Sequence, residues 1–486
     1  MASIEKRSEC SYRITVSAGY NSDGKQIKKH KTINLDPKLT EKQKEKELDR
    51  QSVLFQEEVE RGTYLDADKL TFKQFIEKWL KDYAEPNLAP KTLYRYKELL
   101  DTRIIPALGH IKLSKLQPTH LTSFYNNLRE NGIRIDAKYI AKPELQNLLS
   151  DRGLSHIDIA QLSGISDRTF SGMLSGMSVS HKTAQAVTKT LEVKLDSIFS
   201  LNGEPRGLSE RTVLHHHRLI SSILTAAVQW QLILINPATR VKPPSPERAE
   251  AKHFDEVQTD YILQLMEAEP LKYRTMINLA VYGGMRLGEL AGIEWDDISL
   301  EKGLLQIRQA GQYLPGEGTF TKVPKNESSK RIISLPGTVI SLLKQYKLWH
   351  NGQKAKLGDD LWVDSGRLFT AWNGEPMFPD TPSKWFHKFI QQHNKKIMED
   401  EKISKEDKSK YLLPEVNFHG LRHTNATLLI GQGVDVTTVS SRLGHARTST
   451  TTDIYSHALK KPDIEAANKL ENLFKKKDSS EQSKQA

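Results

Sequence analysis

The stretch NFHGLRHTNATLLIGQGVDVTTVSSRLGHARTSTTTDIYSH, from Asn417 to His457, decides how the rest of the chain is interpreted. It contains His419 and Arg422 in HGLRHT, His445 in LGH, and Tyr455 ten residues after His445. A tyrosine hydroxyl has an unperturbed pKa of about 10 and is a poor nucleophile while protonated. Cationic side chains beside it stabilise the charge that develops on a phosphate under attack. The stretch therefore predicts chemistry on a phosphate, provided that the rest of the chain supplies further cations.

Size, charge and cysteine content limit the class of protein. The chain has 486 residues, enough for three or more domains, and 71 Lys and Arg against 60 Asp and Glu give a net charge of +11. This balance favours an anionic partner, with nucleic acid first and a membrane surface second, although a soluble basic protein fits the charge equally well. Cys10 is the single cysteine, which excludes disulfide frameworks and cysteine zinc sites. With no long apolar run, the sequence predicts a cytoplasmic protein.

Residues 1–65 predict a small sheet followed by a helix. SYRITVSAGY and KQIKKHKTINL have the composition of two strands that flank the turn at 21–24, and residues 39–61 have that of a charged helix. The second strand is rich in lysine, which either blunts an exposed sheet edge or lines a strand face that lies in a DNA groove. The candidate DNA-binding residues of this domain are Lys25, Lys28, Lys29 and Lys31.

Residues 66–134 and 206–244 predict one four-helix domain in two pieces. TFKQFIEKWLKDY places Phe72, Phe75, Ile76, Trp79, Leu80 and Tyr83 at helical spacing, typical of a core stripe. Pro90 is expected to open the next helix and Pro106 to close it, with Arg95 on a basic, DNA-binding side. A direct join between NNLRENG and GLSERTV would give an ordinary short helix connection, so the residues between them look inserted.

Residues 135–205 predict that inserted domain, an all-α bundle of four or five short helices. Ala160 and Gly164 before a tight turn, followed by a helix that opens at Ser166, have the layout of a helix-turn-helix. The stretch resembles phage-repressor-like helix-turn-helix domains, and its second helix would offer Arg168 and Thr169 to base edges. A helical bundle that binds protein is the alternative.

Residues 250–476 predict a mixed, mainly helical domain, and residues 477–486 a flexible tail. YGGMRLGEL places Arg286 at the start of a helix with Glu289 one turn later, where a carboxylate fixes the rotamer of a phosphate-binding guanidinium. TKVPKNESSKRIISLP is interpreted as a hairpin with Lys325 at its turn. The last residues, from Asp463 to Lys477, are expected to form a basic helix.

The order Arg286, Lys325, HxxR, LGH and Tyr455 resembles the tyrosine recombinase, or phage integrase, family over roughly residues 1 to 475. The overall sequence is similar to those of integrases from phages and conjugative transposons of Gram-positive bacteria. The resemblance implies an arm-site-binding domain at 1–65, a core-binding domain at 66–134 and 206–244, and a catalytic domain at 250–476. It implies site-specific DNA recombination that integrates or excises a mobile element through a 3′-phosphotyrosine.

The resemblance also assigns roles to single residues. Tyr455 is the nucleophile, Arg286 and Arg422 bind the non-bridging oxygens, and Lys325 is the general acid. His419 assists proton transfer and His445 binds the phosphate. No metal, cofactor or ATP is implied. The implied partners are double-stranded DNA at attachment sites, three further copies of the chain in a homotetramer, and an excisionase or other DNA-bending protein; no membrane is implied, and the implied location is the bacterial nucleoid in the cytoplasm.

The sequence departs from the family pattern at two points, and two alternative functions stay open. Asn326 stands where the family often has Thr, and Lys322 and Lys330 compete with Lys325 for the role of general acid. The inserted module is outside the common family pattern. A helix-turn-helix transcription regulator would leave the catalytic set unexplained, and a type IB topoisomerase-like enzyme would not need an arm-like N-terminal domain.

Overall fold

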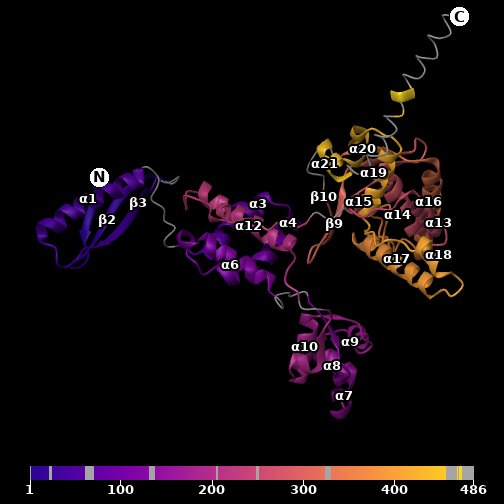
Figure 1. Ribbon diagram of the computed structural model, residues 1–486, viewed down its shortest axis with the longest axis horizontal. Helices are drawn as coiled ribbons and strands as arrows, with labels where there is room; N and C mark the ends of the chain where they lie inside the picture. Colours follow the sequence, from indigo (N-terminus) through magenta and orange to yellow (C-terminus); the bar gives the residue numbers. More distant parts are fainter. Residues whose placement is uncertain are drawn as a thin grey trace, which may run out of the picture. The chain divides into compact units, whose positions relative to one another are not determined.

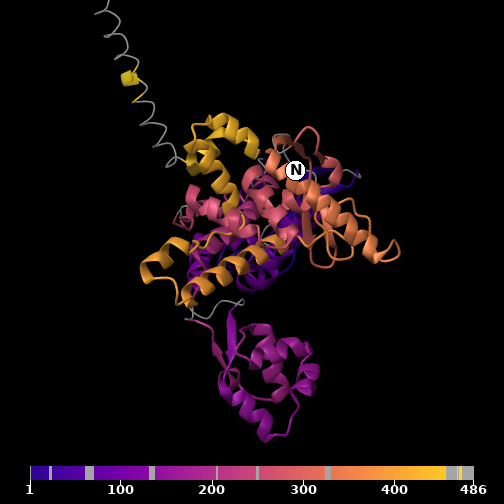
Figure 2. The same ribbon diagram turned by 90° about the vertical axis from the view of Figure 1, so that its right-hand side faces the viewer.

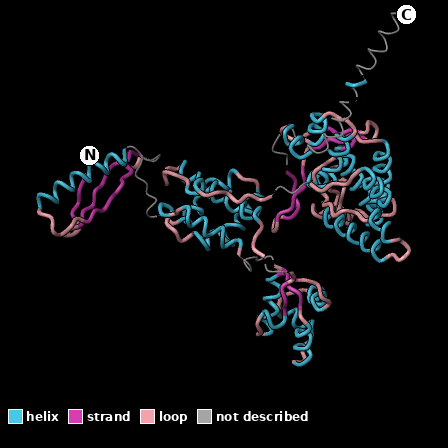
Figure 3. The backbone as a smooth tube through the Cα atoms, in the orientation of Figure 1, coloured by secondary structure: helices cyan, strands magenta, loops and turns pink. Residues whose placement is uncertain are grey.

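The chain divides into two compact units, Met1–Glu247 and Arg248–Ala486. The computed structural model describes residues 2–20, 24–60, 70–130, 137–203, 206–247, 251–322, 330–455, 468 and 470–472 (Figure 1). Helices dominate both units, and the strands form four small sheets within the described ranges (Figure 3). The fold is therefore helix-rich with several small sheets. Among the described helices, none is long and apolar enough to cross a membrane.

The N-terminal sheet has the strand order β1-β2-β3 and is antiparallel throughout. Tyr12, Ile14 and Val16 alternate along β2 on one face and pack against the helix α1, whose Leu48 and Phe55 are buried. This alternation is the period of a half-buried strand. The first strand was not predicted. The elements are β1 (Ser3–Lys6), β2 (Ser11–Tyr20), β3 (Gln26–Asn34) and α1 (Glu41–Glu60).

A second part of this unit is helical and has one hydrophobic core built from residues 72–128 and 213–238 together. Thr71 caps the first helix, and the predicted stripe is buried except for Leu80, which is half-buried, and Tyr83, which is 42% exposed. The elements are α2 (Phe72–Trp79), η2 (Leu80–Ala84), α3 (Glu85–Asn87), α4 (Pro90–Leu99), η3 (Leu100–Ile104), α5 (Ile105–Leu108), η4 (Leu113–Lys115), α6 (Pro118–Arg129), α12 (Glu210–Gln229) and η5 (Pro237–Arg240).

The prediction that Pro106 closes a helix is wrong. The chain passes from α4 through a π-helical turn, η3, and continues as α5, which contains Pro106. A second π-helical turn, η2, comes directly before Pro86 in the same way. A proline cannot donate an N–H and its ring crowds the carbonyl four residues earlier. The wider π turn accommodates the missing donor and the crowding. Each helix therefore changes its hydrogen-bond pattern for one turn and continues past the proline.

The two helices on either side of residues 131–205 meet directly. The Leu208 N–H donates to the Leu128 carbonyl over 2.8 Å, and Arg129 forms a bidentate ion pair with Glu210. A Cβ at Gly207 would lie 2.0 Å from the Arg129 carbonyl oxygen, so this approach requires glycine. We call this contact the seam.

Residues 137–203 have a hydrophobic core of their own, and their two chain ends are also paired, because the Asn202 N–H donates to the Lys138 carbonyl over 2.7 Å. The all-α prediction is wrong here, since a sheet of order β5-β4-β6 joins the entering and leaving strands (Figure 2). The elements are β4 (Lys138–Ala141), α7 (Pro143–Asp151), α8 (His156–Leu162), α9 (Asp167–Leu174), β5 (Val179–Ser180), α10 (His181–Leu191), α11 (Leu195–Ile198) and β6 (Phe199–Leu201).

The C-terminal unit surrounds one large apolar core, to which α13, α14, α16 and α17 contribute buried residues. The elements are α13 (Glu256–Met266), α14 (Leu271–Gly283), α15 (Leu287–Gly292), η6 (Trp295–Asp297), β7 (Ile298–Ser299), β8 (Leu304–Ile307), β9 (Ala310–Leu314), β10 (Gly318–Lys322), β11 (Arg331–Ser334), α16 (Gly337–Leu357), α17 (Thr381–Glu399), α18 (Lys405–Tyr411), α19 (Gly420–Gly431), α20 (Val436–Leu443) and α21 (Thr448–Tyr455).

The predicted hairpin around Lys325 is wrong in its pairing. The strand β10 pairs with β9 in one two-stranded sheet, whereas β11 pairs with β8 in another. The strand β9, AGQYL, was not predicted, because it lacks the β-branched run that marks most strands. Lys325 itself lies in 323–329, outside the described residues, as do the predicted tail at 477–486 and most of the predicted helix at 463–477.

Candidate active site

The first catalytic candidate, Arg286, is placed by the end of α14. Gly284 ends that helix with φ +61°, and a Cβ there would lie 2.6 Å from the Asn425 side-chain oxygen. Only glycine adopts this backbone without strain and leaves room for the neighbouring helix. The chain then turns, and Arg286 becomes the residue immediately before α15.

Glu289 fixes the direction of the Arg286 side chain. Its carboxylate accepts from the Arg286 backbone N–H over 2.9 Å and from Arg286 Nη1 over 2.8 Å, which satisfies the N–H donor before α15 and orients the guanidinium. Arg286 Nη2 donates to the Gly444 carbonyl over 3.1 Å. The Arg286 side chain keeps 39% of its surface exposed, so its guanidinium is oriented and still accessible to a ligand.

Side chains of α19 donate hydrogen bonds to the same end of α14. Arg422, with 2% of its surface exposed, donates through Nη1 to the Gly284 carbonyl over 2.9 Å. Three residues along, Asn425 donates to the carbonyls of Val281 and Tyr282 over 2.8 and 3.2 Å. These contacts bring the HxxR segment of α19 to Arg286 from more than 130 residues away.

The helix α20 completes the frame and leads to α21. Arg442 donates to the Tyr282 carbonyl over 2.7 Å, and the chain then turns at Gly444 with φ +68°. His445 Nδ1 lies 2.8 Å from the Thr451 hydroxyl on α21. Tyr455 is the last residue of α21, four residues beyond Thr451, and its side chain is outside the described part of the structure.

The histidines of this cluster are held neutral by burial and by the arginines. Burial lowers the pKa of His419, and the charges of Arg422 and Arg286 lower it further. Burial, followed by the charges of Arg422 and Arg286, lowers the pKa of His445 to about 4. Their mutual influence indicates that the four described catalytic candidates, Arg286, His419, Arg422 and His445, share one electrostatic environment.

Glu289 stays ionised in the same environment. Burial alone would raise the pKa of its carboxyl, but hydrogen bonds and charge from Arg331 and then Arg286 outweigh burial and lower the pKa below its usual value. The cluster thus contains several guanidinium groups around one buried carboxylate. Such an excess of positive charge is suited to an anion, and a phosphate, like a carboxylate, is bound by arginine in bidentate fashion.

Three residues of this cluster were not singled out in the sequence. Arg331 on β11 holds Glu289, and Asn425 and Arg442 hold the end of α14. Their partners are a distant carboxylate or backbone carbonyls, which leave no local pattern. The nearest signal was an arginine in an otherwise apolar strand, RIIS.

The lysines that compete for the role of general acid are only partly described. Lys322 ends β10 and Lys330 comes directly before β11. The segment between them contains Lys325 and lies outside the described residues. The choice among the three lysines therefore stays a prediction.

The predicted DNA-binding residues lie on the surface of the N-terminal unit, in different situations. Lys31 pairs with Glu58 of α1 over 3.2 Å, and Arg95 pairs with Glu98 on its own helix. The hydroxyl of Thr169 bonds to Ser166, which caps α9, while Arg168 beside it is exposed. Of the remaining three lysines, Lys25 and Lys28 are exposed and Lys29 is half-buried.

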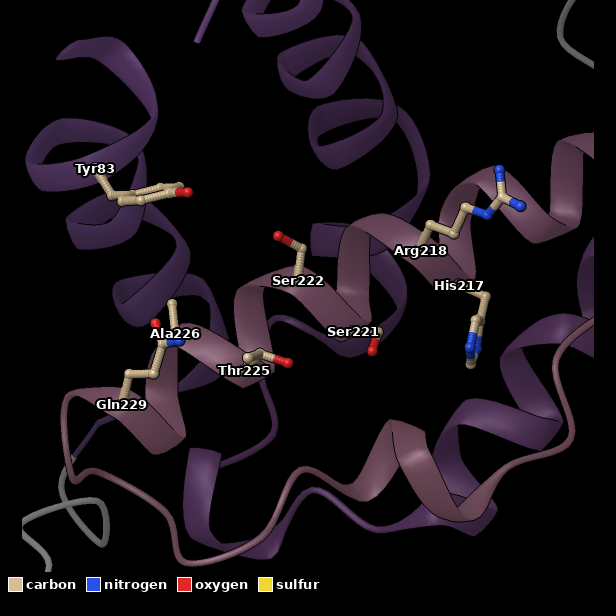
Figure 4. A pocket seen from close by; sticks show the side chains of 8 residues that line it. All are labelled: Tyr83, His217, Arg218, Ser221, Ser222, Thr225, Ala226 and Gln229. Carbon is tan, nitrogen blue, oxygen red and sulfur yellow. The ribbon is translucent and has the colours of Figure 1, made fainter. Parts of the chain in front are cut away.

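A polar hollow of about 350 Å³ lies along α12 in the N-terminal unit (Figure 4). Hydroxyl, imidazole and guanidinium groups line it, with the Tyr83 ring from η2 facing them across the hollow in that view. The lining residues are Tyr83, His217, Arg218, Ser221, Ser222, Thr225, Ala226 and Gln229. Among the residues that the structure describes, no group of three or more His, Cys, Asp or Glu side chains is placed to hold a metal ion.

Two family models match the chain. One, described as the phage integrase family, matches residues 252–461, and the other, the N-terminal SAM-like domain of phage integrases, matches residues 71–129. The first match includes the whole arginine and histidine cluster. The second match covers α2 to α6 of the helical part.

Named relatives and a solved structure agree with these matches. A XerC-like tyrosine recombinase of Caldanaerobacter subterraneus is 28% identical over 55% of this chain and 68% of its own. The ICEBs1 integrase of Bacillus subtilis is 28% identical over 55% of this chain and 67% of its own. The solved Tn1549 transposon integrase, in complex with a circular intermediate DNA, superposes with a TM-score of 0.54 at 16% identity over 82% of this chain and 99% of its own, which supports the fold.

The pKa of His445 predicts a pH dependence of stability. The folded pKa is about 4 against 6.5 for the unfolded chain, so the unfolded state binds more protons between these values, and stability falls as pH drops from 6.5 toward 4. We expect His445→Asn to reduce the loss of unfolding free energy between pH 7.5 and 5.0 by about 1 kcal/mol, after allowance for solvent screening of a half-buried ring. Hydrogen exchange of peptides from α19 and α20 measures this loss. An identical pH dependence in the variant would contradict the assignment.

Proposed function

Because the chain belongs to the phage integrase family of tyrosine recombinases, we propose that it cleaves and rejoins DNA at specific sites through a covalent tyrosine intermediate. It is a site-specific DNA recombinase that integrates or excises a mobile genetic element. The observation that carries the proposal is the convergence of Arg286, Arg422 and His445 at the end of α14, beside the helix that ends in Tyr455.

The first chemical step is attack of the Tyr455 oxygen on the scissile phosphorus. The bond to the 5′ oxygen breaks, and a 3′-phosphotyrosine and a free 5′-hydroxyl form. Arg286 and Arg422 bind the two non-bridging oxygens, whose charge grows in the transition state. The arginines are held by carbonyls and by Glu289 before DNA arrives, so little reorganisation is needed at the moment of reaction.

Proton transfer falls to the lysine and the histidines. Lys325 delivers a proton to the leaving 5′ oxygen, and His419, neutral at pH 7, receives the proton of Tyr455. His445 contacts Thr451 through Nδ1, which leaves Nε2 to bond to the phosphate. Rejoining reverses these transfers, with a 5′-hydroxyl from the partner duplex as the attacking group.

Exchange between two duplexes cuts four strands, and each cut consumes one tyrosine. The working assembly is therefore a homotetramer on paired attachment sites, acting in the cytoplasm at the nucleoid. The direction of the reaction is set by an excisionase or another DNA-bending protein. The solved Tn1549 integrase is in complex with a circular intermediate DNA, which supports DNA as the partner.

The other functions explain less of the chain. A helix-turn-helix regulator would use the inserted segment and leave the arginine cluster without a purpose. A type IB topoisomerase-like enzyme would use the cluster alone. The named relatives are recombinases and integrases, which favours strand exchange over both.

A suicide substrate that carries the attachment site tests the proposal. The 5′-hydroxyl fragment diffuses away, so the wild-type protein should accumulate a covalent protein–DNA adduct that migrates slowly on a denaturing gel. Tyr455→Phe removes the nucleophilic oxygen and should form no adduct while it still binds the same DNA. An adduct in Tyr455→Phe, or binding without any adduct in the wild type, would contradict the proposed reaction.

The N-terminal sheet is proposed to bind distal arm sites through the face opposite α1. Cross-strand partners share a face, and Tyr12, Ile14 and Val16 face the helix. Lys31 and Lys29 pair with Ile14 and Val16, so they lie on the helix side. The opposite face is lined by Ser3, Glu5, Arg13, Thr15, Ser17, Lys28, His30 and Thr32.

Salt dependence distinguishes the two faces. Replacing both Arg13 and Lys28 by alanine should weaken arm-site binding and lower the slope of log affinity against log salt by roughly 1 for each phosphate that is no longer neutralised. Lys31→Gln is the matched control, because Lys31 is engaged with Glu58 and its replacement should leave the slope unchanged. Equal slopes in the double variant and the wild type would exclude this face.

The inserted segment is proposed to add a second DNA contact. Gly164 turns the chain with φ +66° between α8 and α9, and Ser166 caps α9. This arrangement presents the exposed Arg168 and Ser171 near the start of α9, where helix-turn-helix proteins contact base edges. Asn202 and Leu208 are six residues apart, so their separation is at most about 22 Å. The segment therefore reads DNA next to the core site and not a distant arm site.

Deletion of the insert tests this contact. A chain in which residues 131–205 are replaced by a short Gly-Ser linker should keep its fold, because the seam already joins α6 to α12. Its nuclease footprint should shrink beside the core site and stay unchanged at the arm sites. Arg168→Ala in the full chain should weaken core-site binding without changing the arm footprint. A full footprint after deletion would show that the insert does not bind DNA.

A further inference from the structure

Glu289 is the buried carboxylate around which two arginines meet. Only 5% of its side chain is exposed, and its two oxygens accept four hydrogen bonds. Two come from the backbone N–H and Nη1 of Arg286, and two come from Nη1 and Nη2 of Arg331 over 3.2 and 2.8 Å. A carboxylate has about four lone-pair positions, so these bonds use its full capacity.

Arg331 is the better buried of the two partners. Its side chain is 6% exposed, against 39% for Arg286, and it holds both oxygens of Glu289 in a bidentate pair. The strand β11 fixes its position by pairing with β8, where Arg331 lies opposite Ile307. Because Arg331 is buried behind the carboxylate and Arg286 is open to solvent, the two arginines have different tasks.

The charges explain the difference. A buried carboxylate without a counter-charge is costly, and it would take its compensation from the nearest guanidinium. If Arg331 were absent, that group would be Arg286. Arg286 would then turn both terminal nitrogens toward Glu289 and away from a ligand, and its charge would be largely neutralised.

We propose that Arg331 is a positioning residue for phosphodiester cleavage, which supplies the counter-charge of Glu289 and so keeps the guanidinium of Arg286 free to bind the scissile phosphate. The inference rests on the proposed recombinase function. It assigns Arg331 a part in the reaction although all three of its guanidinium nitrogens donate to groups within the protein.

A further contact extends the effect of Arg331 to the other side of the site. Its Nε donates to the carbonyl of Arg442 over 2.6 Å. Arg442 is three residues before His445, so this bond ties β11 to the end of α20. One side chain thus links the segments that carry Arg286 and His445.

Single-turnover adduct formation on the suicide substrate, at saturating protein, is the measurement. Arg331→Met keeps most of the volume and removes the charge, and it should slow adduct formation by about 100-fold, the effect of removing one oxyanion donor. Arg331→Lys keeps the charge without the bidentate geometry, and its rate should fall between those of Arg331→Met and the wild type. Binding affinity for the attachment site should change little, since the guanidinium nitrogens of Arg331 are engaged with Glu289 and the Arg442 carbonyl.

The double variant separates a charge effect from a packing effect. Glu289→Gln removes the uncompensated carboxylate, so Glu289→Gln/Arg331→Met should recover at least about 10-fold of the rate that Arg331→Met loses. A substrate with a neutral methylphosphonate at the scissile position should also reduce the difference between Arg331→Met and the wild type, because it needs less cationic stabilisation. A role in packing alone predicts neither rescue.

Arg308→Met is the matched control. Arg308 also pairs with a buried carboxylate in this unit, that of Asp297, whereas the guanidinium on Glu289 comes from Arg331. Replacement of Arg308 should leave the adduct rate within about twofold of the wild type, a difference of under 0.5 kcal/mol in the barrier. If the double variant is folded and as slow as Arg331→Met on both substrates, the inference is wrong. If the wild type forms no adduct, the proposed function itself fails.

Discussion

The end of α14 is the point on which the active-site geometry depends. Three of its last carbonyls, those of Val281, Tyr282 and Gly284, accept hydrogen bonds from Asn425, Arg442 and Arg422. These carbonyls have no partner within their own helix, because a helix leaves its last four unsatisfied. Side chains from α19 and α20 satisfy them and in doing so fix the position of Arg286 beyond the turn. The same hydrogen bonds therefore satisfy the end of α14 and hold the residues of the site together. They bring α19 so close to position 284 that a Cβ has no room there, which explains the glycine.

Much of the site could be predicted from the sequence, and the part that could not shares one physical cause. Arg286, His419, Arg422 and His445 were predicted from short motifs, and the structure brings these four together. Arg331, Asn425 and Arg442 were missed because each acts on a carbonyl or a carboxylate from a distant segment. A sequence window records helical or strand spacing, but not which buried carbonyl lacks a donor. Lys325 and the side chain of Tyr455 lie outside the described residues, so their roles stay predictions.

The fold shows the same limits. The stretch TFKQFIEKWLKDY was predicted as an amphipathic helix and forms α2 and η2, since its apolar spacing reflects burial directly. The errors lie where local pattern and tertiary context disagree. Pro106 predicts a helix end, yet a π-helical turn absorbs it. The strands β4, β5 and β6 are too short to show alternation. The strand β10 was predicted to pair with β11 but pairs with β9, and β11 pairs with β8. Each of these elements is stabilised by neighbours that its own sequence does not reveal.

The seam between Leu128 and Leu208 has a consequence for how the chain folds. On a ribosome, Phe72 to Leu128 emerges first with half a core, and α12 follows about 80 residues later. Closing so long a loop is entropically unfavourable. Because the insert pairs its own ends at Lys138 and Asn202, its prior folding shortens the open loop to about 16 residues, which lowers the closure cost by about 1.4 kcal/mol. The folded insert thus brings α6 and α12 closer together before their shared core forms.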